Sequence, residues 1–131
     1  MRILFALALI FASFGAAQAE QPERLTDRPV PALKLNAALG WRLSAVLRMD
    51  VEKGVEVLVI EGDVINISDK DRATPKIRLG LRDKDGREFF HWTVLADEAK
   101  IAAREYVPFA ARLEKPPADM ALLEIQTIEN E

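Results

Sequence analysis

The stretch from Val55 to Asn66, VEVLVIEGDVIN, constrains the fold more than any other part of the sequence. It is long and rich in β-branched residues. Successive side chains of a strand point to opposite faces, so Leu58, Ile60 and Val64 share one face. Val59 and Ile65 make the other face partly apolar as well, which is typical of an inner strand with partial cover on its second side. We therefore expect this stretch to be the central strand of a β-sheet.

Gly62 interrupts the apolar face of this predicted strand. A glycine inside a strand lowers stability, and it often marks a bulge or the close approach of a bulky neighbour. We expect Trp92 to be that neighbour and the largest residue of the core. Asn66 and Ser68 should end the strand, because their side chains can hydrogen-bond to nearby backbone groups.

Five further segments show the same period of two. Their apolar residues recur at every second position, and turn residues separate them. The segments are residues 43–51, 76–82, 87–95, 106–113 and 121–127. Residues 52–54 and 83–86 are short, glycine-containing turns, so each predicts an antiparallel hairpin. Pro108 cannot donate a backbone hydrogen bond, which places its strand at a sheet edge.

Six short strands without a long helix between them predict an all-β fold. We expect an immunoglobulin-like antiparallel β-sandwich of about six to seven strands, formed by residues 36–131. Residues 20–35 contain three prolines and few apolar anchors, which favours a flexible lead-in. Within residues 32–41 the spacing of the leucines, followed by Gly40, predicts two or three helical turns. A helical turn is also expected within the connection 96–104.

The first nineteen residues have the pattern of a secretory signal peptide. Arg2 supplies a positive charge, residues 3–14 are almost wholly apolar, and residues 17–19 form a small-x-small cleavage site. The apolar part is shorter than the ~20 residues of a membrane-spanning helix, so an uncleaved anchor is the weaker alternative. We expect cleavage after Ala19, a periplasmic or secreted location, and no stable membrane insertion afterwards.

Charge and cysteine content exclude several classes of function. Without residues 1–19 the chain has 18 − 1 = 17 basic and 21 acidic residues, a net charge of −4 with His91 neutral. Both signs are interspersed, so no basic surface for nucleic acid is expected. The chain contains no cysteine, which excludes disulfides, thiol catalysis and thiolate metal sites.

The sequence resembles a domain of unknown function in bacterial envelope proteins, similar to the FxLYD-type β-sandwich domains. The resemblance covers about residues 36 to 128 and rests on Leu58-x-Ile60-x-Gly62-x-Val64-x-Asn66, Pro75-x-Ile77-x-Leu79-x-Leu81-Arg-Asp, Gly86, Trp92 and Phe109-x-Ala111-x-Leu113-x-x-Pro116-Pro117. Members commonly carry an N-terminal zinc ribbon and a membrane helix, whereas this chain has a predicted signal peptide. The resemblance implies an extracytoplasmic domain with no assigned activity.

Few residues are candidates for metal binding. His91 is the only histidine, and one imidazole cannot supply the two or more ligands that zinc or copper draws from His and Cys. Met49 and Met120 are two isolated thioethers, and Met49 falls on an apolar strand face. Acidic pairs at 69/71, 83/85 and 97/98 suggest calcium, but no downstream glutamate completes a calcium loop. We expect these acidic residues to stabilise turns by hydrogen bonds to the backbone, and we expect no cofactor.

Catalysis is also not expected. The acidic pairs lie on separate turns, which gives no pair of carboxylates facing one cleft. Ser13, Ser44 and Ser68 are not in a glycine elbow. We therefore predict that the protein is not an enzyme.

A row of cations on one predicted strand is the candidate interaction surface. Strand periodicity places Lys76, Arg78 and Arg82 on one face, with Arg87 nearby and Arg48 a further candidate. Such a row is able to attract an acidic partner or an anionic lipid headgroup. The alternative is a solvated face whose cations pair with Glu61 and Asp63.

Two functions remain in view. The first is an exported, non-catalytic domain that mediates protein–protein interaction with an envelope protein, through the cationic row or by strand addition near Pro108. The second is a periplasmic accessory protein that binds a small molecule or a metal.

Overall fold

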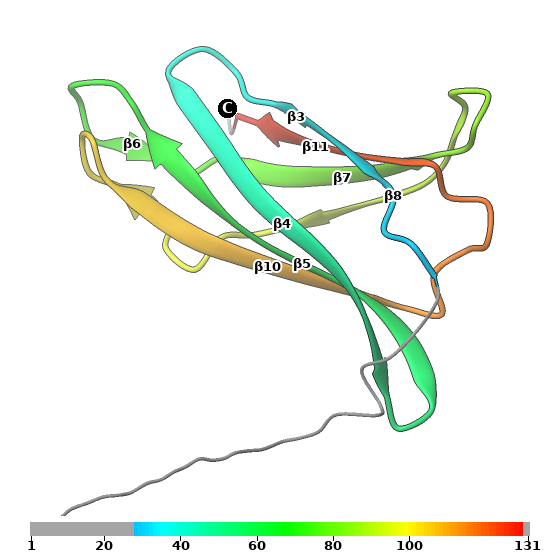
Figure 1. Cartoon of the computed structure of the whole chain (residues 1–131). Helices are drawn as coiled ribbons and strands as arrows, with labels where there is room; N and C mark the ends of the chain where they lie inside the picture. Colours follow the sequence, from blue (N-terminus) through cyan, green and yellow to red (C-terminus); the bar gives the residue numbers. More distant parts are fainter. Residues whose placement is uncertain (1–27, 130–131) are drawn as a thin grey trace, which may run out of the picture.

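Two β-sheets face each other across one apolar layer in the computed structural model (Figure 1). The structure describes residues 28–129, so the predicted signal peptide and the first half of the predicted lead-in, residues 20–27, lie outside the described residues. Within this range there is no helix. The predicted all-β sandwich is therefore confirmed, with seven strands of five or more residues in its two main sheets.

The first sheet has the strand order β10-β5-β4. Strands β4 (Trp41–Glu52) and β5 (Val55–Asn66) form a long antiparallel hairpin, and β10 (Tyr106–Glu114) pairs with the other edge of β5. The hairpin turn consists of Lys53 and Gly54, with φ of 53° and 78°, and positive φ at both residues matches the twist of the flanking strands. As predicted, β5 is the central strand and β10, with Pro108, lies at an edge.

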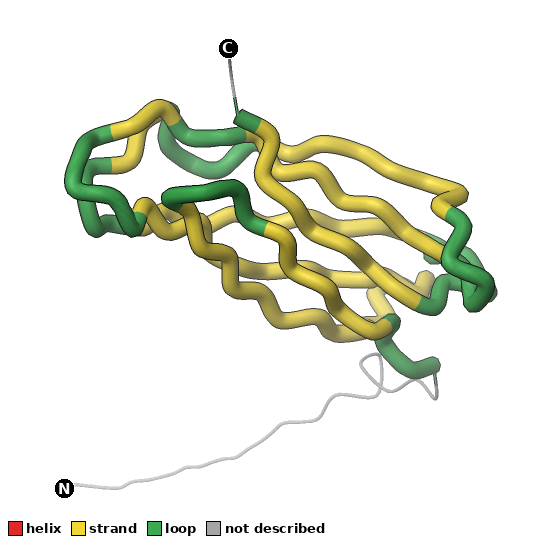
Figure 2. The backbone as a smooth tube through the Cα atoms, turned by 90° about the horizontal axis from the view of Figure 1, so that it is seen from above, coloured by secondary structure: helices red, strands yellow, loops and turns green. Residues whose placement is uncertain are grey.

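The second sheet has the order β3-β11-β7-β8. The antiparallel hairpin of β7 (Lys76–Arg82) and β8 (Glu88–Val94) has a bulge next to Arg82. Strand β11 (Leu122–Ile128) pairs antiparallel with β7 and parallel with β3 (Ala32–Asn36). Two short strands, β6 (Arg72–Ala73) and β9 (Lys100–Ile101), pair outside the main sheets. Figure 2 shows how the strands run side by side, with loops gathered at the two ends.

The core consists of the inward-facing residues that the period of two predicts. The largest fully buried apolar side chains come from β5, β7 and β11 of both sheets, with Ile101 at one end. They are Leu58, Ile60, Val64, Ile77, Leu79, Leu81, Ile101, Leu123 and Ile125. Val57 and Val59 are buried too, although they point away from this layer, which confirms the expected partial cover on the second face of β5.

Two predicted helical segments are wrong. Residues 32–36 form β3, because Leu33 and Leu35 align in register with Leu123 and Ile125 of β11. The sheet therefore begins four residues before residue 36, inside the segment predicted as lead-in. The connection 96–104 contains β9 where a helical turn was expected, since Ile101 is buried and pairs with Arg72.

Trp92 is not the largest core residue. It lies on the edge strand β8 and is only half-buried, so its ring covers the side of the apolar layer. Trp41, the first residue of β4, is buried at 4% exposure and is the tryptophan of the core. The bulky neighbour of Gly62 is likewise not Trp92 but Phe109 of β10, which pairs with Gly62 in the sheet.

Candidate functional site

The predicted cationic row lies on the outer face of the second sheet, where Arg78 forms a two-pronged ion pair. Arg78 Nη1 and Nη2 donate to Glu88 Oε1 at 2.8 Å and to Glu88 Oε2 at 2.6 Å. The pair lies over Gly80, where an added Cβ would stand 2.3 Å from Glu88 Oε1. Gly80 thus provides the space in which the arginine and the carboxylate lie flat on the sheet.

The other cations of the row differ in how they are paired. Arg82 donates to Glu124 at 3.2 Å and to the Gly86 carbonyl oxygen at 3.0 Å. Arg87 is highly exposed and lies 3.6 to 3.7 Å from two carboxylates of its own turn, those of Asp85 and Asp83. Lys76 makes no ion pair with any residue in the described range.

Most cations of the row therefore lie close to carboxylates, as the alternative hypothesis predicted. Their partners are not the predicted Glu61 and Asp63. Glu61 and Asp63 lie on the other sheet, and so does Arg48, which pairs with Asp50 and Glu61. The sequence pattern did not predict Glu88 and Glu124 as partners of these arginines, because only the pairing of β8 and β11 with β7 brings the two glutamates next to them. Binding of an acidic partner by this row remains a prediction.

Hydrogen bonding shifts two carboxylates toward their charged form. The pKa of Glu88 is lowered, chiefly because Arg78 donates hydrogen bonds to it, and the pKa of Arg78 is raised for the same reason. The pKa of Asp83 is lowered mainly by the backbone N–H of Arg87 and also by that of Asp85. Asp83 therefore serves the β7–β8 turn, as expected for this acidic pair.

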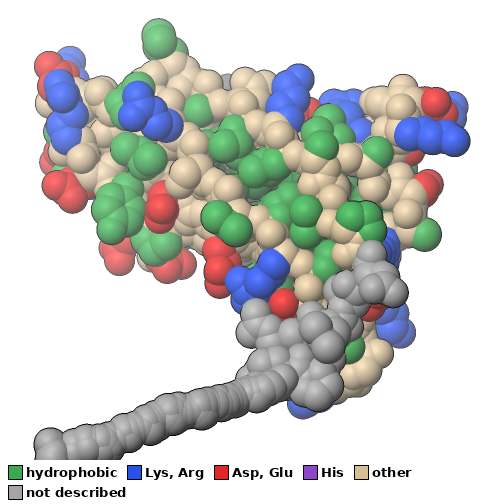
Figure 3. All heavy atoms as spheres, in the orientation of Figure 1, with side chains coloured by type: hydrophobic (Ala, Val, Ile, Leu, Met, Phe, Trp, Pro, Cys, Tyr) green, Lys and Arg blue, Asp and Glu red, His purple; other side chains and the backbone are tan. Residues whose placement is uncertain are grey.

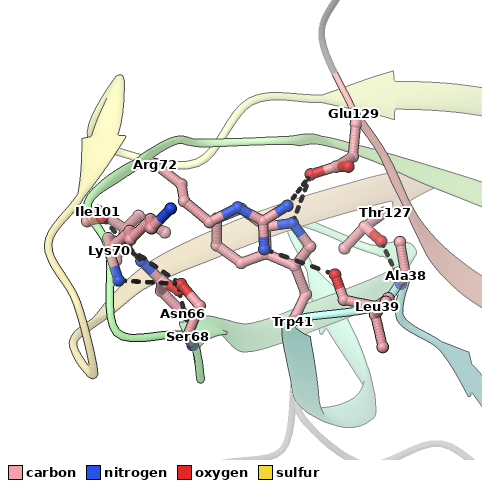
Figure 4. Close-up of polar contacts among 10 residues, drawn as sticks. All are labelled: Ala38, Leu39, Trp41, Asn66, Ser68, Lys70, Arg72, Ile101, Thr127 and Glu129. Carbon is pink, nitrogen blue, oxygen red and sulfur yellow. Dashed lines mark hydrogen bonds and ion pairs between the residues drawn. The ribbon is translucent and has the colours of Figure 1, made fainter.

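A cluster at one end of the sandwich fastens the end of β11 to the rest of the fold (Figure 4). The guanidinium carbon of Arg72 lies 4.5 Å from the centre of the Trp41 ring. Trp41 Nε1 donates to Glu129 Oε2 at 2.7 Å, and Arg72 Nη2 donates to the same oxygen at 2.5 Å. One carboxylate thus links β4, β6 and the residue after β11.

Asn66 organises the loops at the same end (Figure 4). Its side chain is fully buried, and its Nδ2 donates to the carbonyl oxygens of Lys70, Ile101 and Ala102 at 2.8 to 3.3 Å. Its Oδ1 accepts from the backbone N–H and the hydroxyl of Ser68. These contacts confirm the predicted end of the strand at Asn66. The Asn66 amide has a second role that was not predicted, because it also holds the loop that leads into β10.

The four sheet edges differ in how open they are to a further strand. On β10, the carbonyl oxygen of Pro108 accepts a hydrogen bond from Asp97 N–H at 3.2 Å, and the proline nitrogen cannot donate. The strand-addition site predicted near Pro108 is therefore partly covered by the protein's own loop.

On the side of the molecule shown in Figure 3, hydrophobic side chains gather in the middle and charged side chains lie around them. Leu33 of β3 and Leu47 of β4 are among the partly buried residues that close the apolar layer between the sheets.

Strand β8 is the most aromatic of these edges. It pairs only with β7, and within residues 28–129 its backbone makes no hydrogen bond outside that pairing. Phe89 and Phe90 are 39% and 41% exposed, and the Phe90 and Trp92 rings lie 5.3 Å apart. His91 lies between Phe90 and Trp92 in the strand and is exposed on the opposite, outer face. The sequence showed these aromatic residues but not that they lie on an edge.

Residues 28–129 form neither a metal centre nor a membrane-spanning helix. No three or more His, Cys, Asp or Glu side chains in residues 28–129 are grouped so as to hold a metal ion. None of the described residues forms a helix of the length and apolar character needed to cross a membrane.

The fold and these surfaces define a small all-β sandwich domain. No family model and no curated protein matches the sequence. Among solved structures, a DUF1425 family member from Shewanella sp. PV-4 aligns with a TM-score of 0.42 and 18% sequence identity, covering 70% of this chain and 79% of that chain. That neighbour is a bacterial domain of unknown function. The FxLYD-type resemblance is not confirmed by these comparisons.

Proposed function

We propose that this protein is an exported, non-catalytic interaction domain that binds another envelope protein along the edge of β8. The observation that carries the proposal is the combination found on β8, an edge strand with no further backbone partner in the described range and with exposed aromatic rings. Export rests on the signal-peptide pattern of residues 1–19.

Strand addition suits this edge physically. An extended segment of a partner gains main-chain hydrogen bonds from an unpaired strand, and alternate side chains provide specificity. Large aromatic residues contribute most to binding energy at interfaces, and β8 offers Phe89, Phe90 and Trp92. Proteins usually protect an open edge with charges or proline. In β8 the positions from Phe89 to Val94 contain neither a formal charge at neutral pH, with His91 neutral, nor a proline.

The test compares two lysine substitutions in the mature protein. Phe90→Lys places a charge on the β8 edge, and Val46→Lys is the control, because Val46 is exposed on a strand of the other sheet. Each tagged variant is incubated with an envelope extract, and the captured proteins are quantified by mass spectrometry. Thermal unfolding of both variants verifies the fold, and Phe89→Lys replaces Phe90→Lys if the latter is unfolded.

The proposal predicts one enriched protein that is recovered with wild type and Val46→Lys but lost with Phe90→Lys. Equal recovery with all variants would contradict binding at β8. Enrichment of nothing above a tag-only sample would contradict an interaction role in the envelope.

A further inference from the structure

Two arginines differ from all others in the described range. Seven of the nine arginines there lie within 4.0 Å of a carboxylate oxygen, namely Arg28, Arg48, Arg72, Arg78, Arg82, Arg87 and Arg112. Arg42 and Arg104 have no carboxylate partner among residues 28–129. Their positive charge is therefore not balanced by a direct ion pair within this part of the protein.

These two arginines line the same hollow. The hollow has a volume of about 390 Å³, and its other lining residues are Ile65, Asn66 and Ile67. Arg42 of β4 pairs in register with Ile65 of β5, and Ile65 pairs with Tyr106 of β10. Ile67 is 40% exposed and Tyr106 is 61% exposed. The hollow thus combines two guanidinium groups with the apolar side chains of two isoleucines, and the exposed ring of Tyr106 lies on the neighbouring strand β10.

The backbone that carries Arg104 is fixed by the Asn66 cluster. Asn66 Nδ2 donates to the Ala102 carbonyl oxygen at 3.3 Å, and Glu105 N–H donates to the same carbonyl at 3.1 Å. Arg104 itself has a φ of 68°, and its Nε donates to the Ser68 carbonyl oxygen at 3.2 Å. Its two terminal nitrogens make no hydrogen bond to any described residue and remain available for a ligand.

We propose that this hollow binds a carboxylate of an acidic, partly apolar segment of a partner protein. A guanidinium matches a carboxylate with two parallel hydrogen bonds, and the charge of the two arginines favours an acidic occupant over a neutral one. The isoleucines match an apolar residue beside that carboxylate. Because the loop is already held in place, little ordering opposes binding. This site lies on the other sheet from β8 and does not depend on strand addition there.

The experiment titrates the isotope-labelled mature protein with a defined probe and follows it by NMR. The probe is an acetylated and amidated pentapeptide, Gly-Leu-Glu-Leu-Gly, and the matched control peptide has glutamine in place of glutamate. The variants are Arg42→Ala and Arg104→Ala. Arg112→Ala is the control variant, since Arg112 lies on the same sheet but is paired with Glu52.

The proposal predicts saturable shifts at Ile65, Ile67 and Arg104 with the glutamate peptide, and binding at least tenfold weaker in Arg42→Ala and Arg104→Ala. Arg112→Ala should bind like wild type. Equal shifts with the glutamine peptide, equal affinity in all variants, or shifts confined to other residues would overturn it. Inorganic phosphate and vesicles rich in phosphatidylglycerol are added as further arms, and binding to these alone would also overturn the assignment to an acidic protein segment.

Discussion

The ring of Phe109 lies directly over the bare backbone of Gly62 on the neighbouring strand. A Cβ added at Gly62 would lie 2.7 Å from Phe109 Cζ and 2.2 Å from the Ser44 carbonyl oxygen. Both distances are far shorter than a van der Waals contact, and one of them is to backbone that cannot move away. Close packing across the centre of the first sheet therefore requires glycine at position 62.

Gly62→Ala should accordingly destabilise the protein by about 3 kcal/mol, the upper part of the range for overpacked cores. Urea unfolding of residues 20–131 measures this change in the free energy of unfolding. Gly54→Ala is the control, because nothing lies within 4 Å of its added Cβ and only the positive φ of 78° opposes alanine. It should cost about 1 kcal/mol. Equal costs for the two variants would show that Phe109 does not require the glycine.

Replacing Asn66 by alanine should lower stability by about 3 kcal/mol. The substitution removes five hydrogen bonds and leaves the buried carbonyl oxygen of Ile101 without its side-chain donor. Thermal unfolding measures the loss, and amide exchange should show faster opening of residues 67–71 and 102–105. A variant as stable as wild type, with unchanged exchange in these loops, would contradict the role assigned to Asn66.

Acid should weaken the protein partly through Glu88. Its pKa is lower in the folded state than the ordinary value of about 4.3, so the unfolded chain takes up the proton first as the pH falls. The stabilisation is fully present above about pH 4.3 and is lost as the pH falls through the lower folded-state pKa.

Glu88→Gln removes this titration, so its stability should fall less steeply with acidification below about pH 4.3 than that of wild type. The difference should be at most about 1 kcal/mol, because the ion pair is partly exposed. Urea unfolding at several pH values between neutral and acid gives the comparison. Arg78→Gln, which removes the donor, should flatten the curve in the same way. Parallel curves for wild type and both variants would refute this account of Glu88.

Processing of the N-terminus is a prediction from the sequence pattern of residues 1–19. Expressed in a bacterium as residues 1–131, the protein should be recovered from the periplasm or the medium as a chain that begins at Glu20. Intact-mass analysis determines the cleaved position. Ala19→Arg should block processing, because the position before the cut requires a small residue. A full-length cytoplasmic product from the wild-type gene would contradict export.

The local pattern of the sequence predicts most strands but not how they neighbour one another. Alternation places Ile77 and Leu79 on the core face of β7 because each residue's face depends only on its own strand. Strand β3 was predicted as helix, since its short run of leucines fits both periods and only pairing with the distant Ile125 makes it a strand. The exposure of Trp92 also depends on the sheet edge, which alternation does not reveal.

For the candidate sites, too, the sequence predicts which residues share a strand face but not which residues of other strands lie beside them. Lys76, Arg78 and Arg82 share a face as predicted, yet two of them bind Glu88 and Glu124, which the fold brings alongside. Arg42 and Arg104 lie far apart in the sequence and carry no motif, so only the structure shows that they line one hollow and lack a carboxylate partner among residues 28–129. The aromatic run of β8 was evident in the sequence, whereas its open edge was not.

The central claim, that β8 receives a partner strand, is tested most directly by hydrogen–deuterium exchange. A protein of residues 20–131 is measured alone and with the partner recovered from the envelope. The account predicts slower exchange of the amides of residues 88–94 on binding, and no such slowing with Phe90→Lys. Unchanged exchange along β8, with protection only elsewhere on the sandwich, would contradict it.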